Sequence, residues 1–362
     1  MNRVFSGRAA NMDDIEAFIL ANPTTVRAPL ILISQVQRSG GTLLGQLLDS
    51  HPEVAAYPDE LRFGQSDDAW PTIGAAHGEE QSFRMLFDLK VAKQMAKGFV
   101  KGDRDPVRHR YFVVPRLQHN LFIKLCRATP PKTGRDIFDL FFTSYFNVWL
   151  NYRGDLKGKK WIAAFAPRLA DNAASVAAFF ENYPDGRLIQ VIRDPRTWYP
   201  SARNHRTTRL KGKSLEEILE RWRVSARSML NYKRLYGSRV VIVKFEDLVG
   251  RTEETMRALT TELAITWDPI LLRPTFNGEP VRANSSFNVE DAGVIAAPLE
   301  RGVLTSDSER KLIEETCVEL YEQVAAAALA VVSQPTRLCF DRPTFKESNE
   351  GPSGSVNADA RS

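Results

Sequence analysis

The chain has 362 residues, of which 43% are hydrophobic and 26% charged, with a formal net charge of +5 and three cysteines. These values are ordinary for a soluble globular protein, and neither a signal-peptide pattern nor an apolar run approaching the ~20 residues of a membrane span is present. Because Cys126, Cys317 and Cys339 have no metal-binding spacing and cannot all pair, the sequence predicts a reduced, cytoplasmic compartment.

The predicted elements begin with a polar leader, residues 1–28, that carries one short amphipathic helix around 12–20. A first strand and its helix follow at 29–49, because an apolar run rich in Ile and Leu gives way to a helical pattern near Thr42. Pro52 lies just beyond this pattern, and the helix is expected to end before it because proline cannot continue a helix.

A helical cap, inserted at about 63–160, is the next expected element. Residues 60–80 are rich in Asp, Glu and Gly and indicate a mobile loop. From 83 to 150, apolar residues recur at three- and four-residue spacing, with breaks at prolines, which is typical of short helices.

An alternation of strands and helices resumes at Trp161. The predicted strands cover 161–165, 188–192 and 239–245, and the predicted helices cover 172–182, a basic segment up to 209, 214–235 and 306–332. Asp171 is the candidate N-cap of the helix at 172–182. This order predicts an α/β fold, with a P-loop-type parallel sheet and helices on both faces. We expect one domain over 29–345 and a disordered tail over 346–362.

The loop at 35–41, between the first strand and its helix, has the composition of an anion site. Its glycines allow the backbone to approach a ligand, and the N–H groups and dipole of the following helix favour negative charge. Arg38, Ser39 and Thr42 add a cation and two hydroxyl groups. The loop is not a Walker A loop, since no glycine opens it and Arg38 precedes a Ser-Gly-Gly-Thr run.

A second candidate phosphate site follows the strand at 188–192. Arg193 comes directly after the strand, and Ser201 comes eight residues later, on the next helix. A guanidinium and a hydroxyl in these places can bind one phosphate from two sides, although a surface ion pair between Arg193 and Asp194 is an alternative. Two phosphate sites on one sheet indicate a nucleotide with phosphate at both ends of its ribose, which is the shape of 3'-phosphoadenosine 5'-phosphosulfate (PAPS).

Four segments resemble the PAPS-dependent sulfotransferase family. QRSGGTLLGQLLDSHPEV resembles its 5'-phosphosulfate loop, closest to the tyrosylprotein and bacterial glycan-type branches, and IRDPRTWYPS resembles its 3'-phosphate motif. VVIVKFEDL and RANSSF are similar to the later strand and the late nucleotide-contacting loop. The likeness covers roughly 29–62 and 161–330, and it implies the sulfotransferase fold and PAPS as sulfuryl donor.

The resemblance also implies roles for individual residues. Arg38 would stabilise the bridging oxygen and the departing 5'-phosphate. Arg193 and Ser201 would hold the 3'-phosphate. The residues expected to surround the 5'-phosphosulfate are Ser39, Gly40, Gly41, Thr42 and Leu43 from the first loop and Asn284, Ser285 and Ser286 from the late one.

The acceptor hydroxyl needs a base, and Glu60 matches the family's catalytic glutamate with one residue of slack. A carboxylate near a basic, anion-loaded site can act as general base if its pKa is suitable. Asp59 could take the role instead, and a solvated loop carboxylate is the structural alternative. Arg62 would then contact acceptor or cofactor. His109 and His205 are weaker candidates for the base.

One position departs from the tyrosylprotein branch, where a lysine stands two residues before a proline after the third-strand segment. Here that residue is Phe165, before Pro167, and Arg168 follows the proline. If a positive charge near the transferred group is needed, either Arg168 supplies it from another direction or Arg38 acts more alone.

Two segments carry excess positive charge: 84–135 has 13 Lys and Arg against 3 Asp, and 193–213 has 7 basic residues against 1 acidic. Such segments favour an anionic ligand or acceptor because a focused field raises its local concentration. We expect a hydroxyl acceptor, preferably a carbohydrate, with an anionic glycan or peptide both compatible. No metal is required, because a basic site already neutralises the cofactor. Trp198 and Trp222 are expected in the core rather than against adenine.

Two other functions fit parts of the pattern. A P-loop phosphotransferase (kinase) would need a Walker lysine and a magnesium-binding acidic residue, and the Arg193–Ser201 spacing argues against it. A non-catalytic nucleotide- or nucleic-acid-binding module would gain from the basic segments and would not need Glu60, although nucleic acid is the less favoured partner.

Overall fold

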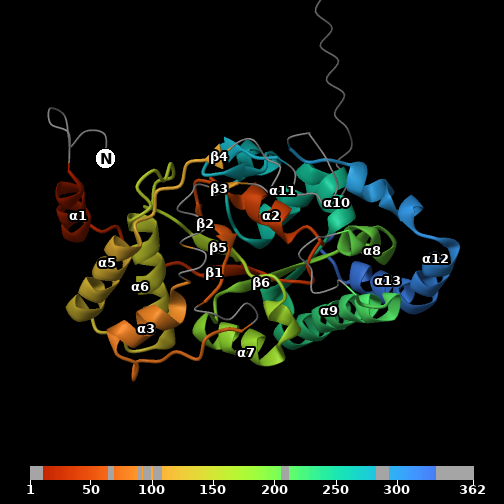
Figure 1. Ribbon diagram of the computed structural model, residues 1–362, viewed down its shortest axis with the longest axis horizontal. Coiled ribbons are helices and arrows are strands. Elements are labelled where there is room, and N and C mark those ends of the chain that lie inside the picture. Colours follow the sequence, from red (N-terminus) through yellow and green to blue (C-terminus); the bar gives the residue numbers. More distant parts are fainter. Residues whose placement is uncertain are drawn as a thin grey trace, which may run out of the picture. The chain divides into compact units, whose positions relative to one another are not determined.

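The structure is a computed structural model that describes residues 11–63, 69–88, 92, 99–100, 108–204, 212–282 and 293–331. The chain divides into two compact units, Met1–Val331 and Val332–Ser362. All elements below belong to the first unit (Figure 1). Within the described part of the chain, no helix is both long and apolar enough to cross a membrane.

A five-stranded sheet with the order β2-β5-β1-β6-β7 forms the centre of this unit, and every strand pairing in it is parallel. The strands are β1 (Leu30–Ile33), β2 (Val54–Glu60), β5 (Trp161–Phe165), β6 (Arg187–Ile192) and β7 (Val240–Lys244). The chain leaves β1 toward β2 on one side, and the later connection from β5 crosses to β6 on the other side of β1. Ligands bind at such a switch point in open parallel sheets, at the carboxyl ends of the strands.

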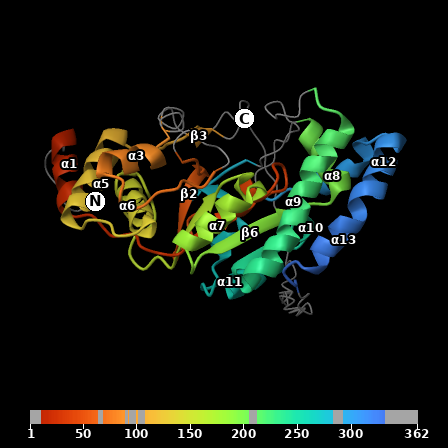
Figure 2. The same cartoon turned by 90° about the horizontal axis from the view of Figure 1, so that it is seen from below.

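Helices cover both faces of the sheet, so the predicted fold class is confirmed (Figure 2). Leu30 and Leu32 of β1 pack with residues of α6 (Gly134–Asn147), α7 (Ala173–Asn182) and α9 (Leu215–Tyr236). Ile31 and Ile33 pack on the other face with residues of α2 (Gly41–Leu48), α10 (Phe245–Gly250) and α11 (Thr252–Glu262). A strand buried on both faces has no polar alternation, which is why its sequence is a continuous apolar run.

The segment between β2 and β5 contains the predicted helical cap. Its helices are α3 (Glu79–Leu86), α5 (Pro115–Ala128) and α6, and short strands β3 (Phe99–Val100) and β4 (Arg108–His109) form an antiparallel pair. Pro115 occupies the first turn of α5, where its missing N–H costs nothing. A second small pair, β8 (Thr275–Phe276) and β9 (Glu279–Pro280), follows α11.

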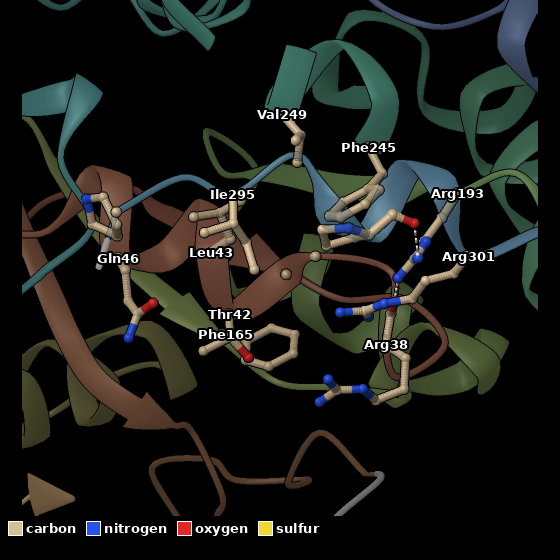
Figure 3. A pocket seen from close by; sticks show the side chains of 15 residues that line it. Arg38, Thr42, Leu43, Gln46, Phe165, Arg193, Phe245, Val249, Ile295 and Arg301 are labelled. Atoms are coloured by element: carbon tan, nitrogen blue, oxygen red, sulfur yellow. Dashed lines mark hydrogen bonds between the residues drawn. The ribbon is translucent and has the colours of Figure 1, made fainter. Parts of the chain in front are cut away.

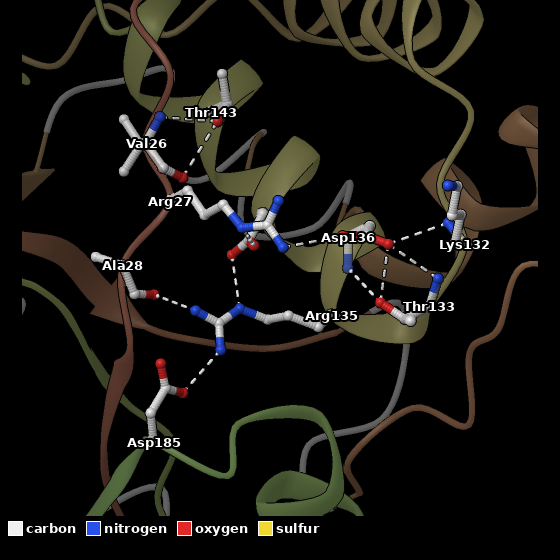
Figure 4. Close-up of polar contacts among 10 residues, drawn as sticks. Val26, Arg27, Ala28, Lys132, Thr133, Arg135, Asp136, Thr143 and Asp185 are labelled. Carbon is white, nitrogen blue, oxygen red and sulfur yellow. Dashed lines mark hydrogen bonds and ion pairs between the residues drawn. The ribbon is translucent and has the colours of Figure 1, made fainter.

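A cluster of arginines and aspartates docks α6 at the amino ends of β1 and β6 (Figure 4). This amino-end cluster consists of Arg27, Arg135, Asp136, Asp139 and Asp185. Arg135 lies 2.9 Å from Asp139 and 2.8 Å from Asp185, and its Nη2 donates to the carbonyl of Ala28 at 3.0 Å. Burial opposes the charge of Arg135, but its two carboxylate partners outweigh burial and raise its pKa.

Three predicted elements were wrong in detail. The loop expected at 60–80 overlaps two elements, because Glu60 is the last residue of β2 and Glu79 starts α3. The strand β2 was not predicted, and its Pro58 is tolerated because β2 is an edge strand. The N-cap of α7 is Asn172, whose side chain accepts from two N–H groups, while Asp171 ends a 3₁₀ turn. The helix predicted at 306–332 ends at Ala326, and the Leu329 N–H instead donates to Ile242 of β7 at 2.7 Å.

The C-terminal helical region is also interrupted. It comprises α12 (Asp307–Ile313), a π-helical turn (Glu314–Val318) and α13 (Glu319–Ala326). Near it, α8 (Pro195–Arg203) and the 3₁₀ helix η4 (Ala297–Leu304) pack together beside the end of β6.

Candidate active site

The loop after β1 turns into α2 through two glycines that no other residue could replace without strain. Gly40 has a φ of +104°, and a Cβ there would lie 2.5 Å from the ring of Phe245. A Cβ on Gly41 would lie 2.1 Å from Nε2 of Gln35. Gly40 is also the N-cap of α2, so no side chain caps the helix. The first N–H groups of α2 are therefore directed at the space in front of the loop, where an anion is favoured.

Ser39 adds a second donor that the protein does not use internally. The residue is 1% exposed, and its Oγ has no hydrogen-bond partner among the described residues. Because a buried hydroxyl without a partner is costly, its presence beside a helix N-terminus indicates a ligand that completes it.

Arg193, at the end of β6, is fixed by a full set of hydrogen bonds. Its Nε donates to Oγ1 of Thr197 at 3.0 Å, and its Nη2 donates to the carbonyls of Thr197 and Pro298 at 2.8 and 2.9 Å. Its Nη1 donates to Oγ of Ser201 at 3.3 Å and to the carbonyl of Arg38 at 3.1 Å. All these acceptors are neutral, so they position the guanidinium without neutralising its charge. Glu246 and Asp194 act on that charge from further away and raise the pKa of Arg193, but burial and Arg301 outweigh them.

The alternative of a surface ion pair between Arg193 and Asp194 is wrong. Asp194 pairs with Arg196 at 2.7 Å, and Arg193 is only 3% exposed. The predicted partnership of Arg193 with Ser201 is seen directly, because the two side chains are hydrogen-bonded.

Arg301, from η4, is a third arginine beside Arg38 and Arg193, and the sequence did not predict it as a site residue. It is 6% exposed, and its Nη1 donates to Oγ of Ser201 at 2.8 Å. The chain has 49 Lys and Arg residues, and nothing in the local sequence distinguishes this one. Its sequence position, between a proline-started turn and Gly302, gives only a weak signal for a loop that approaches a ligand.

Arg38, Arg193 and Arg301 form the carboxyl-end cluster, in which like charges depress one another's pKa. Burial and then Arg301 lower the pKa of Arg38 to about 10, against an opposing effect of Glu60. Burial and then Arg301 lower the pKa of Arg193 to about 9, and Arg38 contributes in the same direction. Burial lowers the pKa of Arg301 too. A bound anion would relieve this stored repulsion.

A cleft of about 660 Å³, including its open mouth, connects the cluster with the loop (Figure 3). This volume is within the range of pockets that hold small molecules and cofactors. The carboxyl-end cluster, Gly40, Gly41 and Thr42 line part of this cleft, and the remaining wall is largely apolar. The apolar side chains that line it are Leu43, Phe165, Phe245, Val249, Pro274, Ile295 and Pro298.

Glu60 is the last residue of β2 and pairs with Phe165 of β5 in the sheet. Its backbone is thus held in a strand and not in a loop, while its side chain is 30% exposed. Its charge raises the pKa of Arg38, so the two side chains are close. Arg62 forms an ion pair with Glu60, with Nη2 2.7 Å from Oε2.

The other predicted residues divide into two groups. Asn284, Ser285, Ser286 and His205 lie outside the described residues, as does the side chain of Asp59. His109 is buried, and its Nδ1 lies 3.1 Å from Oε2 of Glu279, so it links β4 to β9. Arg168 has a φ of +67°, and its N–H donates to the carbonyl of Gln35 at 3.1 Å.

Two buried tryptophans form hydrogen bonds to the backbone of the two predicted phosphate sites. Nε1 of Trp198 donates to the carbonyl of Gln37 at 2.8 Å, and Nε1 of Trp222 donates to the carbonyl of Arg193 at 3.0 Å. Both indoles are nearly inaccessible, which agrees with their predicted place in the core. Among the residues that the structure describes, no group of His, Cys, Asp and Glu side chains is arranged to hold a metal ion.

Comparisons with known proteins identify the family and the fold. A model of the sulfotransferase family matches residues 29–269. The sulfotransferase domain of the Synechococcus PCC 7002 olefin synthase is 16% identical, with a TM-score of 0.51, and the match covers 84% of this chain and 98% of that domain. This likeness shows the fold. No curated protein matches the sequence.

Two further solved structures resemble the chain less closely in shape. The sulfotransferase domain from the curacin biosynthetic pathway is 14% identical with a TM-score of 0.47, covering 84% of this chain and 98% of that domain. A mouse sulfotransferase complexed with PAP is 10% identical with a TM-score of 0.38, covering 88% of this chain and 94% of that one.

Proposed function

The chain belongs to the sulfotransferase family, and from this premise we propose that it transfers the sulfuryl group of PAPS to a hydroxyl group of an acceptor, preferably a carbohydrate. The observation that carries the proposal is the carboxyl-end cluster. It joins the two predicted phosphate sites physically, because Nη1 of Arg193 donates to the carbonyl of Arg38. A nucleotide with phosphate at both ends of its ribose would be held by both sites at once.

The described residues fit such a nucleotide. Arg193, Ser201 and Arg301 would hold the 3'-phosphate, since one hydroxyl already bridges the two guanidiniums. Arg193 uses all five N–H donors within the protein, so it would exchange one bond to a neutral oxygen for the phosphate or act through its charge. Gly40, Gly41 and the unpartnered Oγ of Ser39 would surround the 5'-phosphate with donors. The donor supplies an activated sulfuryl group whose leaving group is a phosphate. Arg38 would stabilise the charge that appears on that phosphate, since it lines the cleft together with Gly40 and Gly41.

Glu60 would act as the general base. In the balanced reaction, the acceptor oxygen forms a bond to sulfur, the bond from sulfur to the 5'-phosphate oxygen breaks, and the hydroxyl proton goes to a carboxylate oxygen of Glu60. The ion pair with Arg62 uses Oε2 of Glu60, so Oε1 is the oxygen that would accept the proton. Arg62 would then contact the acceptor or the donor, as the resemblance implies.

The acceptor side explains why Phe165 is compatible with this chemistry. Phe165 lines the cleft beside Glu60, where the tyrosylprotein branch has a lysine, so Arg38 supplies the positive charge near the transferred group. A hydrophobic side chain at this place favours an acceptor that presents C–H groups as well as hydroxyls. A sugar ring meets this requirement better than a strongly charged acceptor does.

The direct test is transfer from radiolabelled PAPS to a panel of glycans, hydroxyl-bearing peptides and small alcohols. We expect label transfer that falls at least 100-fold in Glu60→Gln with unchanged affinity for PAP, the desulfated product, because only the base is removed. Arg38→Ala should lower both transfer and PAP affinity.

Glu253→Gln is the matched control, because Glu253 also forms a 2.7 Å ion pair with an arginine but lies on α11. It should behave as the unmodified protein. Failure to bind PAP would refute the proposal, and magnesium-dependent binding of ATP would favour a kinase instead. Transfer that survives in Glu60→Gln would move the role of base to another residue, with Asp59 first to be tested.

A further inference from the structure

Gln46, on α2, has a buried side chain whose nitrogen has no partner in the part of the chain that the structure describes. The residue is 9% exposed and lines the cleft, and its Nε2 has no hydrogen-bond partner among the described residues. A buried amide N–H group without a partner is costly, so this one calls for an explanation beyond the fold.

The cleft has two chemically different sides, and Gln46 lies on the polar one (Figure 3). Val249 and Ile295 lie together on one side of α2. Thr42 and Gln46 extend to the other side, toward which the guanidinium of Arg38 also points. The shared direction of Thr42 and Gln46 follows from their spacing, because residues four apart occupy the same face of a helix.

The polar side is the side of the proposed base. Glu60 pairs in the sheet with Phe165, and the ring of Phe165 lies beside Thr42 in the cleft. The charge of Glu60 also raises the pKa of Arg38. A hydroxyl that reaches Glu60 must therefore approach along this side. The rest of the acceptor would then extend past Phe165 toward Gln46.

We propose that Gln46 binds the acceptor by donating an N–H of Nε2 to a second oxygen of that molecule, distinct from the hydroxyl that is sulfated. This inference rests on the proposed function and names the acceptor class more narrowly. Thr42 marks the start of α2, where the loop would hold the group to be transferred, and Gln46 lies one helical turn further, about 6 Å along the axis. This length is comparable to the distance between the two oxygens of a 1,4-disubstituted six-membered ring. The favoured acceptor is a cyclic polyol or sugar with oxygens on opposite sides of its ring.

The experiment uses the full chain saturated with PAP and two simple probes, trans-cyclohexane-1,4-diol and cyclohexanol. Ligand-observed NMR titrations give the affinity of each probe. The second hydroxyl of the diol can accept a hydrogen bond from Gln46 that cyclohexanol cannot form. We therefore expect the diol to bind about tenfold more tightly than cyclohexanol. In Gln46→Met, which keeps the volume and removes the donor, this preference should disappear, while both probes still bind and PAP affinity changes less than twofold.

Gln118→Met is the matched control. Gln118 is 1% exposed, its Nε2 is likewise without a described partner, and it lies on α5 away from the lining of the cleft. It should keep the tenfold preference, so any general effect of replacing a buried glutamine is measured separately.

Each outcome is decisive. Equal affinities for the two probes in the unmodified protein, a preference that persists in Gln46→Met, or no binding of either probe would overturn the role of Gln46 alone, provided that PAP binds. Failure of PAP to bind would overturn the proposed function and this inference together.

Discussion

The two arginine clusters lie at opposite ends of the same strands and differ in one respect. In the amino-end cluster, carboxylates face the guanidiniums and the pKa of Arg135 is raised. In the carboxyl-end cluster, the guanidinium donors of Arg193 go to neutral oxygens, and the arginines lower one another's pKa. Both clusters are built on arginines, although Arg27 and Asp185 of the amino-end cluster are far more exposed than Arg193 and Arg301. The charge balance is what separates the structural contact from the candidate binding site.

This difference predicts opposite responses to mutation. Removing a guanidinium from the amino-end cluster leaves buried negative charge behind, whereas removing one from the carboxyl-end cluster relieves repulsion. The first change should damage stability and spare binding, and the second should do the reverse.

The largest effect is expected from Arg135→Met. Its removal leaves the nearly buried Asp139 without its closest partner, and breaking a buried pair in this way costs about 3–5 kcal/mol in the free energy of unfolding. Urea denaturation measures this, and PAP affinity of the folded protein should not change. Arg27→Met is the control, because Arg27 is 63% exposed and should contribute less than about 1 kcal/mol. Equal losses in the two variants would contradict the comparison.

A smaller effect on the free energy of unfolding is expected from the titration of Asp139. Burial raises the pKa of Asp139 to about 6 even though Arg135 opposes it. A carboxyl group with a raised folded-state pKa binds its proton more tightly when folded, so the unmodified protein should gain stability relative to Asp139→Asn as pH falls from about 6 to 4. The gain is at most about 3 kcal/mol. Urea denaturation of both proteins between about pH 6 and 4 measures this gain. If the free energy of unfolding changes equally with pH in the two proteins, Asp139 does not have a raised pKa in the folded state.

Arg301→Met tests the other cluster. Loss of one charged donor to phosphate should weaken PAP binding about 30-fold, or about 2 kcal/mol, measured by isothermal titration calorimetry. The free energy of unfolding without ligand should stay the same or rise, because repulsion with Arg38 and Arg193 is lost. A variant that binds PAP normally would remove Arg301 from the site.

The smallest effect concerns inorganic phosphate. At concentrations above its dissociation constant, phosphate should stabilise the unmodified protein by about 1 kcal/mol, because it binds only the folded state. Thermal unfolding should show the shift in Arg27→Met as well, and a reduced shift in Arg301→Met. An equal shift in all three proteins would indicate a general salt effect instead.

The central strands and the two phosphate loops could be predicted because their signals are local. The apolar run of β1 and the glycines after it require no knowledge of the rest of the chain. Arg193 likewise directly follows one strand, and Ser201 lies on the short helix α8 that comes next, so one local segment brings them together.

The features that escaped prediction depend on distant parts of the chain. Pro58 is acceptable in β2 only because β2 is an edge strand, and that position is set by the pairing of β5 between β1 and β2. Arg301 reaches the site because η4 packs on α8, which no local pattern specifies. Gln46 reads as an ordinary helical residue until its burial without a partner is seen.

The bonds of Arg193 also have a consequence for folding. They join residues that are 155 positions apart, at Arg38, and 105 apart, at Pro298. Contacts over such distances in sequence form late, since closing long loops is entropically costly. The site is then complete only after the folding transition state, so an anionic ligand should slow unfolding without accelerating folding. A nascent chain would acquire its ligand only after η4 has been synthesised.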